Sequence, residues 1–87
     1  HDIRDTIAAS GSVAVDFTIV DYLISQAWTG DDWAGVIIAS LGLEDCAVLL
    51  QRTEPTIWTI VDLGTGLTHG DVLGYGAPFA IADFVAP

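Results

Sequence analysis

CAVLLQRTEPTIWTIVDLGTG, residues 46–66, is the stretch around which the rest of the chain is organised. It holds two short apolar runs, Cys46–Arg52 and Ile57–Leu63, which are rich in Val, Ile, Leu and Trp. Two such runs joined by a short polar segment predict a β-hairpin. Pro55 has no N–H to give to a strand ladder, so residues 53–56 are expected to form a four-residue loop.

Two further strands are expected before the hairpin. Residues 13–19 alternate between apolar and polar side chains, which is typical of a half-buried strand that runs on as far as Ser25. After Ile19 the apolar positions change phase, so we expect a bulge or a bend there. The change of phase places two groups of apolar side chains on opposite faces: Val15, Phe17 and Ile19 on one, and Val20, Tyr22 and Ile24 on the other. A turn at residues 30–32 leads to a second strand at 33–40.

The two ends of the chain predict helices. Residues 2–10 have Ile3 and Ile7 one helical turn apart, which favours a short first helix. Residues 65–77 hold four of the nine glycines and are expected to be a loop. Pro78 and the apolar spacing after it predict a short closing helix, with an extended tail as the alternative. The sequence therefore predicts a single α+β domain over 1–87, with a short N-terminal helix, a four-stranded antiparallel meander, and a short C-terminal helix or extended tail.

The charge of the chain excludes several kinds of partner. Twelve acidic residues face only two basic ones, Arg4 and Arg52, and the net charge is −10. Nucleic acids and anionic membrane surfaces need Lys and Arg, so neither is an expected partner. No apolar run approaches the ~20 residues of a membrane helix, so no membrane insertion is expected. The hydrophobic content of 52% is high for a chain of 87 residues, which suggests that an apolar face meets a partner.

No group of residues in the sequence makes a convincing catalytic or cofactor site. Asp62, His69 and Asp71 have the right atoms for a divalent cation, but their spacing matches no defined metal loop. Neither a phosphate-binding loop nor a Gly-x-Ser-x-Gly elbow is present. The single cysteine, Cys46, lies on an apolar strand and is expected to behave as a small buried hydrophobe. We therefore expect a protein that is not an enzyme and has no catalytic residue, metal site or cofactor.

Aromatic residues are the candidate binding side chains. Trp28 and Trp33 flank the first turn, and Tyr22 lies on the first strand. Aromatic side chains carry much of the contact energy at protein interfaces, so these three are the predicted binding residues. Trp58 lies in the middle of the hairpin and is expected in the core instead.

Part of the sequence resembles a pattern found in small exported domains of actinobacteria, most of which have no assigned function. The resemblance covers about residues 32–85 and rests on four short motifs: Asp32-Trp33-Ala34, residues 48–52 (VLLQR), residues 58–65 (WTIVDLGT), and Ala77-Pro78. It implies a secreted or cell-envelope setting and no known catalytic residues. The chain starts at His1 and not at Met, so we also expect a processed product.

These observations together favour a non-enzymatic acidic protein-interaction module. Its expected partner is a protein or further copies of itself in a homo-oligomer. The alternative is an accessory or ligand-carrying domain with a cavity between sheet and helix.

Overall fold

A computed structural model describes residues 2–10, 17–28, 30–39, 45–55 and 57–86. The described elements, in chain order, are α1 (Asp2–Ala9), β1 (Thr18–Gln26), β2 (Asp32–Ala39), β3 (Cys46–Glu54), β4 (Ile57–Gly64), α2 (His69–Gly74) and α3 (Phe79–Val85). The strands form one antiparallel sheet in the order β1-β2-β3-β4, so each strand pairs with its neighbour in the sequence. The predicted α+β class and the four-stranded meander are confirmed. Most of the expected alternating segment, residues 13–16, lies outside the described residues.

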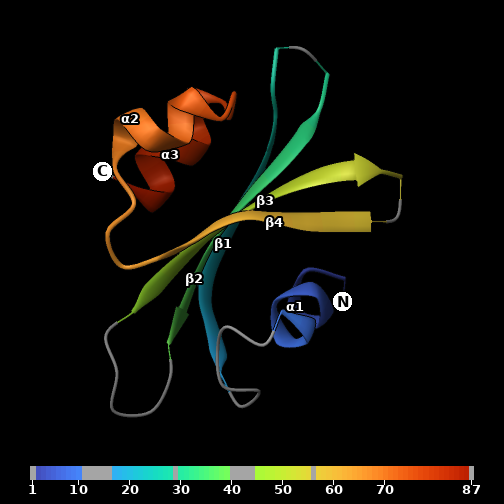
Figure 1. The fold of residues 1–87 in the computed structure, drawn as a ribbon, viewed down its shortest axis with the longest axis vertical. Helices are drawn as coiled ribbons and strands as arrows, with labels where there is room; N and C mark the ends of the chain where they lie inside the picture. Colours follow the sequence, from blue (N-terminus) through green and yellow to red (C-terminus); the bar gives the residue numbers. More distant parts are fainter. Residues whose placement is uncertain (1, 11–16, 29, 40–44, 56, 87) are drawn as a thin grey trace.

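The strongly twisted sheet carries helices on both faces, with α1 on one side and α2 and α3 on the other (Figure 1). Each face has its own buried cluster. We call the cluster on the α1 face the α1-side core; its buried members are Ile7, Phe17, Ala34, Val36, Ile38, Val48, Leu50 and Trp58. The α3-side core includes Trp33, Leu49, Val72, Ile81, Ala82 and Val85. The C-terminal helices therefore cover the face of the sheet that lies opposite α1.

The bulge predicted after Ile19 is confirmed, but its consequence for the two faces was predicted wrongly. Ile19 pairs with Ile38, and Asp21 pairs with Ile37, so Val20 is the extra residue of β1. A bulge sets two residues of one strand against a single residue of its partner. Because Val20 is the extra residue, the side chains after it return to the same faces as before, and Tyr22 lies on the same face as Ile19. That face is the α1 face, whose cross-strand rows are Ile19–Ile38–Cys46, Tyr22–Val36–Val48–Leu63 and Ile24–Ala34–Leu50–Ile60.

The hairpin of β3 and β4 is confirmed with a tighter connection than predicted. Glu54 pairs with Ile57, so the strands extend into the expected loop and Pro55 lies at the turn. Trp58 faces α1 and is only 7% exposed, which confirms its predicted place in the core. A second bulge, at Val61, shifts the register between the pairs Leu50–Ile60 and Leu49–Asp62.

The region expected to be a glycine-rich loop contains the helix α2. Thr68 is its N-cap, and the side-chain oxygen Oγ1 of Thr68 accepts a hydrogen bond of 3.1 Å from the backbone N–H of Asp71. After Pro78 the predicted closing helix is present as α3, so the alternative of an extended tail is wrong. Pro78 is the N-cap of α3, and Phe79, the first residue of the helix, is 70% exposed. None of the helices described here is long and apolar enough to cross a membrane.

Candidate functional site

The three predicted binding residues do not form one surface. Trp33 is only 2% exposed and lies in the α3-side core, so the prediction that it takes part in a binding surface is wrong. Side chains along a strand point alternately to the two faces of the sheet. Trp33, which pairs with Ser25 and Gln51, lies on the face that α3 covers. Trp28 is 98% exposed in the turn after β1, and Tyr22 is 58% exposed on the α1 face.

A pocket of about 370 Å³ lies between α1 and the sheet, and we call it the α1 groove. Its lining comes from four elements: Ile3 and Arg4 of α1, Ile19, Tyr22 and Ile24 of β1, Arg52 of β3, and Trp58 of β4. Of the predicted binding residues, the groove includes Tyr22 alone. Ile24, which lies beside it on β1, is 47% exposed. Because these β1 side chains are about half exposed, the groove is open to solvent along β1.

The position of α1 explains why the groove is open. Ile7 on α1 is fully buried, and the helix lies against β4, at one edge of the sheet. A helix of eight residues is too short to cover the four strands, so the apolar side chains of β1 at the other edge remain partly uncovered. The groove is therefore a consequence of covering a wide sheet face with a short helix.

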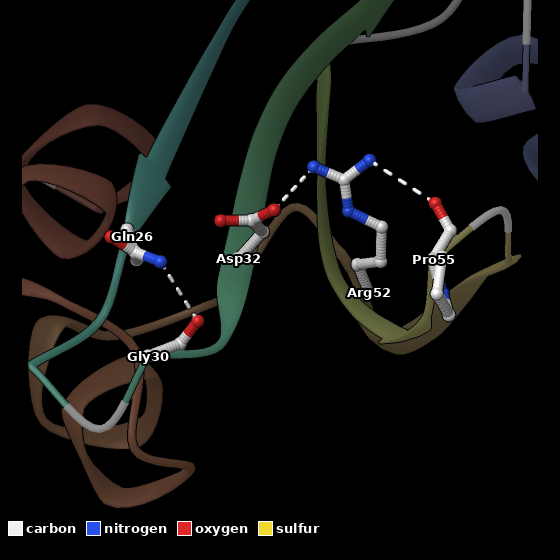
Figure 2. Close-up of polar contacts among 5 residues, drawn as sticks. All are labelled: Gln26, Gly30, Asp32, Arg52 and Pro55. Carbon is white, nitrogen blue, oxygen red and sulfur yellow. Dashed lines mark hydrogen bonds and ion pairs between the residues drawn. The ribbon is translucent and has the colours of Figure 1, made fainter.

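Arg52 closes the end of the groove near the hairpin turn. Its guanidinium lies 4.9 Å from the centre of the Trp58 ring, and these two residues face each other across β3 and β4. The Nη2 atom of Arg52 forms an ion pair with the carboxylate of Asp32, and Nη1 lies 3.5 Å from the carbonyl oxygen of Pro55 (Figure 2). The side chain of Arg52 remains 34% exposed. The guanidinium is thus held by an aromatic ring and two acceptors while it still meets solvent.

Arg4 is held in a similar way on α1. Its guanidinium lies 4.4 Å from the centre of the Phe17 ring, and its Nη2 donates a hydrogen bond of 2.9 Å to the carbonyl oxygen of Phe17. Phe17 belongs to the α1-side core and is 1% exposed, so it offers a fixed platform. Both basic side chains of the chain therefore line the same groove, each stacked on a core aromatic ring.

The sequence analysis did not single out either arginine as a binding residue. The sequence did contain one sign of their importance. The chain has only two basic residues against twelve acidic ones, so the position of each arginine could have been considered as a possible binding site. Nothing in the local sequence brings them together, since they are separated by the whole of β1 and β2. Only the packing of α1 across the sheet places them in one groove.

The weaker metal candidates lie apart from this groove and are engaged elsewhere. The hydroxyl of Tyr75 donates a hydrogen bond of 2.9 Å to the carboxylate of Asp62. That bond and the negative charge of Asp62 raise the pKa of Tyr75. His69 Nε2 lies 2.7 Å from the carboxylate of Asp83 and joins the start of α2 to α3. Within the described ranges, no three His, Cys, Asp or Glu side chains come together in a way that would hold a metal ion.

Cys46 lies at the start of β3, where it is partly buried against the α1-side core. Burial raises the pKa of its thiol, and a hydrogen bond with the backbone of Gly64 partly offsets that rise. A raised pKa leaves less thiolate at neutral pH, so the environment of Cys46 does not activate it as a nucleophile.

Comparisons with models of protein families, with curated proteins and with solved structures found no significant match for this chain. The resemblance to exported actinobacterial domains stays a prediction from the sequence.

Proposed function

We propose that this protein is a non-enzymatic binding module that holds a protein partner, or a second copy of itself, on the α1 groove. One observation carries the proposal. Tyr22 and Ile24 are 58% and 47% exposed, and both line a concave site whose other walls belong to α1 and the hairpin. Apolar side chains that gather around an open concave site are typical of interaction surfaces.

The polar groups of the groove support binding more than catalysis. The charged groups among the lining side chains are two guanidiniums, and an arginine does not exchange its proton near neutral pH. In the part of the chain that the structure describes, the two groups whose pKa is raised are the Cys46 thiol and the Tyr75 hydroxyl, and neither residue lines the groove. The groove therefore offers fixed hydrogen-bond donors and apolar surface, which suit recognition.

A second candidate function is that of an accessory or ligand-carrying domain. The groove lies between sheet and helix, and its volume of about 370 Å³ falls within the range of small-molecule sites. Small-molecule sites bury most of their ligand, whereas this groove is open along β1, so its shape favours the protein-binding function. The secreted or cell-envelope setting that we propose for either function rests on the sequence resemblance alone.

Sedimentation velocity at moderate salt tests self-association through this surface. We expect the chain to associate as its concentration rises, and we expect Tyr22→Ser and Ile24→Ser to weaken that association. Phe79→Ser is the control, because Phe79 is an apolar residue, 70% exposed, on α3, across the sheet from the groove. A monomer at every concentration would overturn self-association, and an equal loss in the control would show that the α1 groove is not the surface used.

A further inference from the structure

We infer that the α1 groove recognises a segment of a partner protein that carries an apolar side chain beside a single carboxylate. This inference rests on the proposed function and deepens it by naming the chemistry of the partner. The apolar side chain would lie against Ile19, Tyr22 and Ile24, and the carboxylate would meet one of the two guanidiniums that line the groove, Arg4 or Arg52.

The distribution of charge is the first argument. The chain has ten more acidic than basic residues, yet both of its basic residues line one groove. An arginine that served only to balance the surface would be expected near any of the twelve acidic residues. Arg4 instead stacks on a core ring and bonds a backbone carbonyl oxygen. Arg52 is paired with Asp32, but its side chain is still partly exposed to the groove. The groove is thus a place where an acidic protein presents guanidiniums to a ligand.

The second argument is that both guanidiniums are held in place before a ligand arrives. Arg4 is fixed by the ring and carbonyl oxygen of Phe17, and Arg52 by the Trp58 ring and the carboxylate of Asp32. A guanidinium carries five N–H donors, so one that is held by two acceptors can still donate to a carboxylate from a partner. Groups that are ordered in advance lose less entropy when they bind.

The net charge of −10 limits how acidic the partner segment can be. A run of carboxylates would be repelled by Asp32, which contacts Arg52, and by the exposed Asp5 and Glu54, which follow Arg4 and Arg52 by one and two residues in the chain. A single carboxylate in contact with a guanidinium is screened less by salt than those longer-range repulsions, which fade over about 10 Å at 0.1 M salt. The expected segment therefore has one acidic residue and otherwise neutral flanks.

A partner segment fits the open side of the groove better than a free small molecule does. The half-exposed walls at Tyr22 and Ile24 leave a ligand exposed on the side of β1. That side is also an edge of the sheet, because β1 is the first strand in the order and pairs only with β2 within the described sheet. A bound side chain can therefore belong to a polypeptide that continues along β1, where an unpaired strand edge offers backbone hydrogen bonds.

Fluorescence anisotropy with three labelled synthetic peptides tests the inference. Each peptide has two leucines, followed by one Glu, by one Gln, or by four Glu residues. We expect the one-Glu peptide to bind about fivefold more tightly than the Gln peptide, since an exposed ion pair contributes up to about that factor. The peptide with four Glu residues is expected to bind more weakly than the one-Glu peptide at low salt.

Variants of the protein connect that preference to the arginines. Arg4→Gln is expected to reduce the preference for Glu over Gln severalfold. Ala80→Glu on α3 is the matched control, because it makes the net charge more negative by the same amount at an exposed position outside the groove. Arg52→Lys keeps the charge at the second position but loses the planar fork, so it is expected to reduce the preference partly. Thermal melting of each variant separates a loss of binding from a loss of folding, and Arg4, which is exposed, gives the safer variant.

The outcomes separate this inference from the proposed function. Equal binding of the Glu and Gln peptides, with loss of both in Ile24→Ser, would overturn carboxylate recognition and leave a binding module. Saturable binding of octanoate that displaces the one-Glu peptide and exceeds its affinity would overturn the partner segment in favour of a small amphipathic acid. If no peptide binds and the chain stays monomeric, both the inference and the proposed function fail.

Discussion

Gly35 on β2 lies directly beneath α3, and its lack of a side chain sets how closely the helix approaches the sheet. A Cβ at this position would lie 2.6 Å from Cγ1 of Val85 and 3.1 Å from Cδ2 of Phe84. Carbon atoms pack at about 3.5–4.0 Å, so Gly35→Ala forces something to move. Val85 is β-branched and stiff in a helix, so α3 itself must shift. We expect the free energy of unfolding to fall by about 1–3 kcal/mol.

Urea denaturation measures this cost, and two further variants make the result specific. Gly70→Ala in α2 is the control, because no atom lies within 4 Å of the position of its Cβ. It is expected to stabilise the protein by about 0.5–1 kcal/mol, as alanine favours a helix over glycine. Val85→Ala deletes two methyl groups and is expected to cost about 1.6 kcal/mol or more. In the double variant the clash is relieved, so Gly35→Ala should add little to the cost of Val85→Ala.

Two results would refute this reasoning. If Gly35→Ala is as stable as the natural chain, α3 does not lie as close to β2 as the structure shows. If the costs of Gly35→Ala and Val85→Ala simply add, the contact that limits the approach of α3 is not the one with Val85.

Three other predictions follow from burial and charge. Trp58→Ala should lower the free energy of unfolding by about 3–5 kcal/mol, because the ring is 7% exposed in the α1-side core; an equally stable variant would place the ring outside that core. Alkylation of Cys46 at neutral pH should be slower in the folded protein than in urea, since a raised thiol pKa leaves less thiolate; faster reaction in the folded protein would contradict the burial of Cys46. Melting temperature should rise from low to moderate salt as the repulsion of ten excess negative charges is screened, and a flat or falling curve would mean that the acids are already paired.

The strands of the fold were predictable because their signals are local. Cys46–Arg52 and Ile57–Leu63 carry the apolar runs of a hairpin, and the change of phase after Ile19 marks the bulge that the structure contains. The helix α2 was not predicted, because Gly70 and Gly74 indicated a loop more strongly than the capping residue Thr68 indicated a helix. Glycine lowers helix propensity, but packing against α3 supplies the stability that the sequence of α2 lacks.

The faces of the sheet and the groove were harder to predict, because both depend on contacts between distant residues. A change of phase looks the same in the sequence whether the side chains change face or a bulge absorbs the change, and only the pairing of Ile19 and Asp21 decides between them. Trp28 and Trp33 flank the same turn, yet one is exposed and the other buried because the C-terminal helices cover the face on which Trp33 lies. Arg4 and Arg52 line one groove only after α1 packs across the sheet.

Mapping of backbone amide shifts by NMR, as the one-Glu peptide is titrated into the protein, tests the binding face most directly. The account predicts that the shifts gather on residues 3 and 4 of α1, residues 19–24 of β1, and the hairpin positions Arg52 and Trp58. The amides of α2 and α3, on the other face of the sheet, should not move. Shifts that gather on α2 and α3, or a complete absence of shifts at saturating peptide, would contradict the claim that the α1 groove is the binding site.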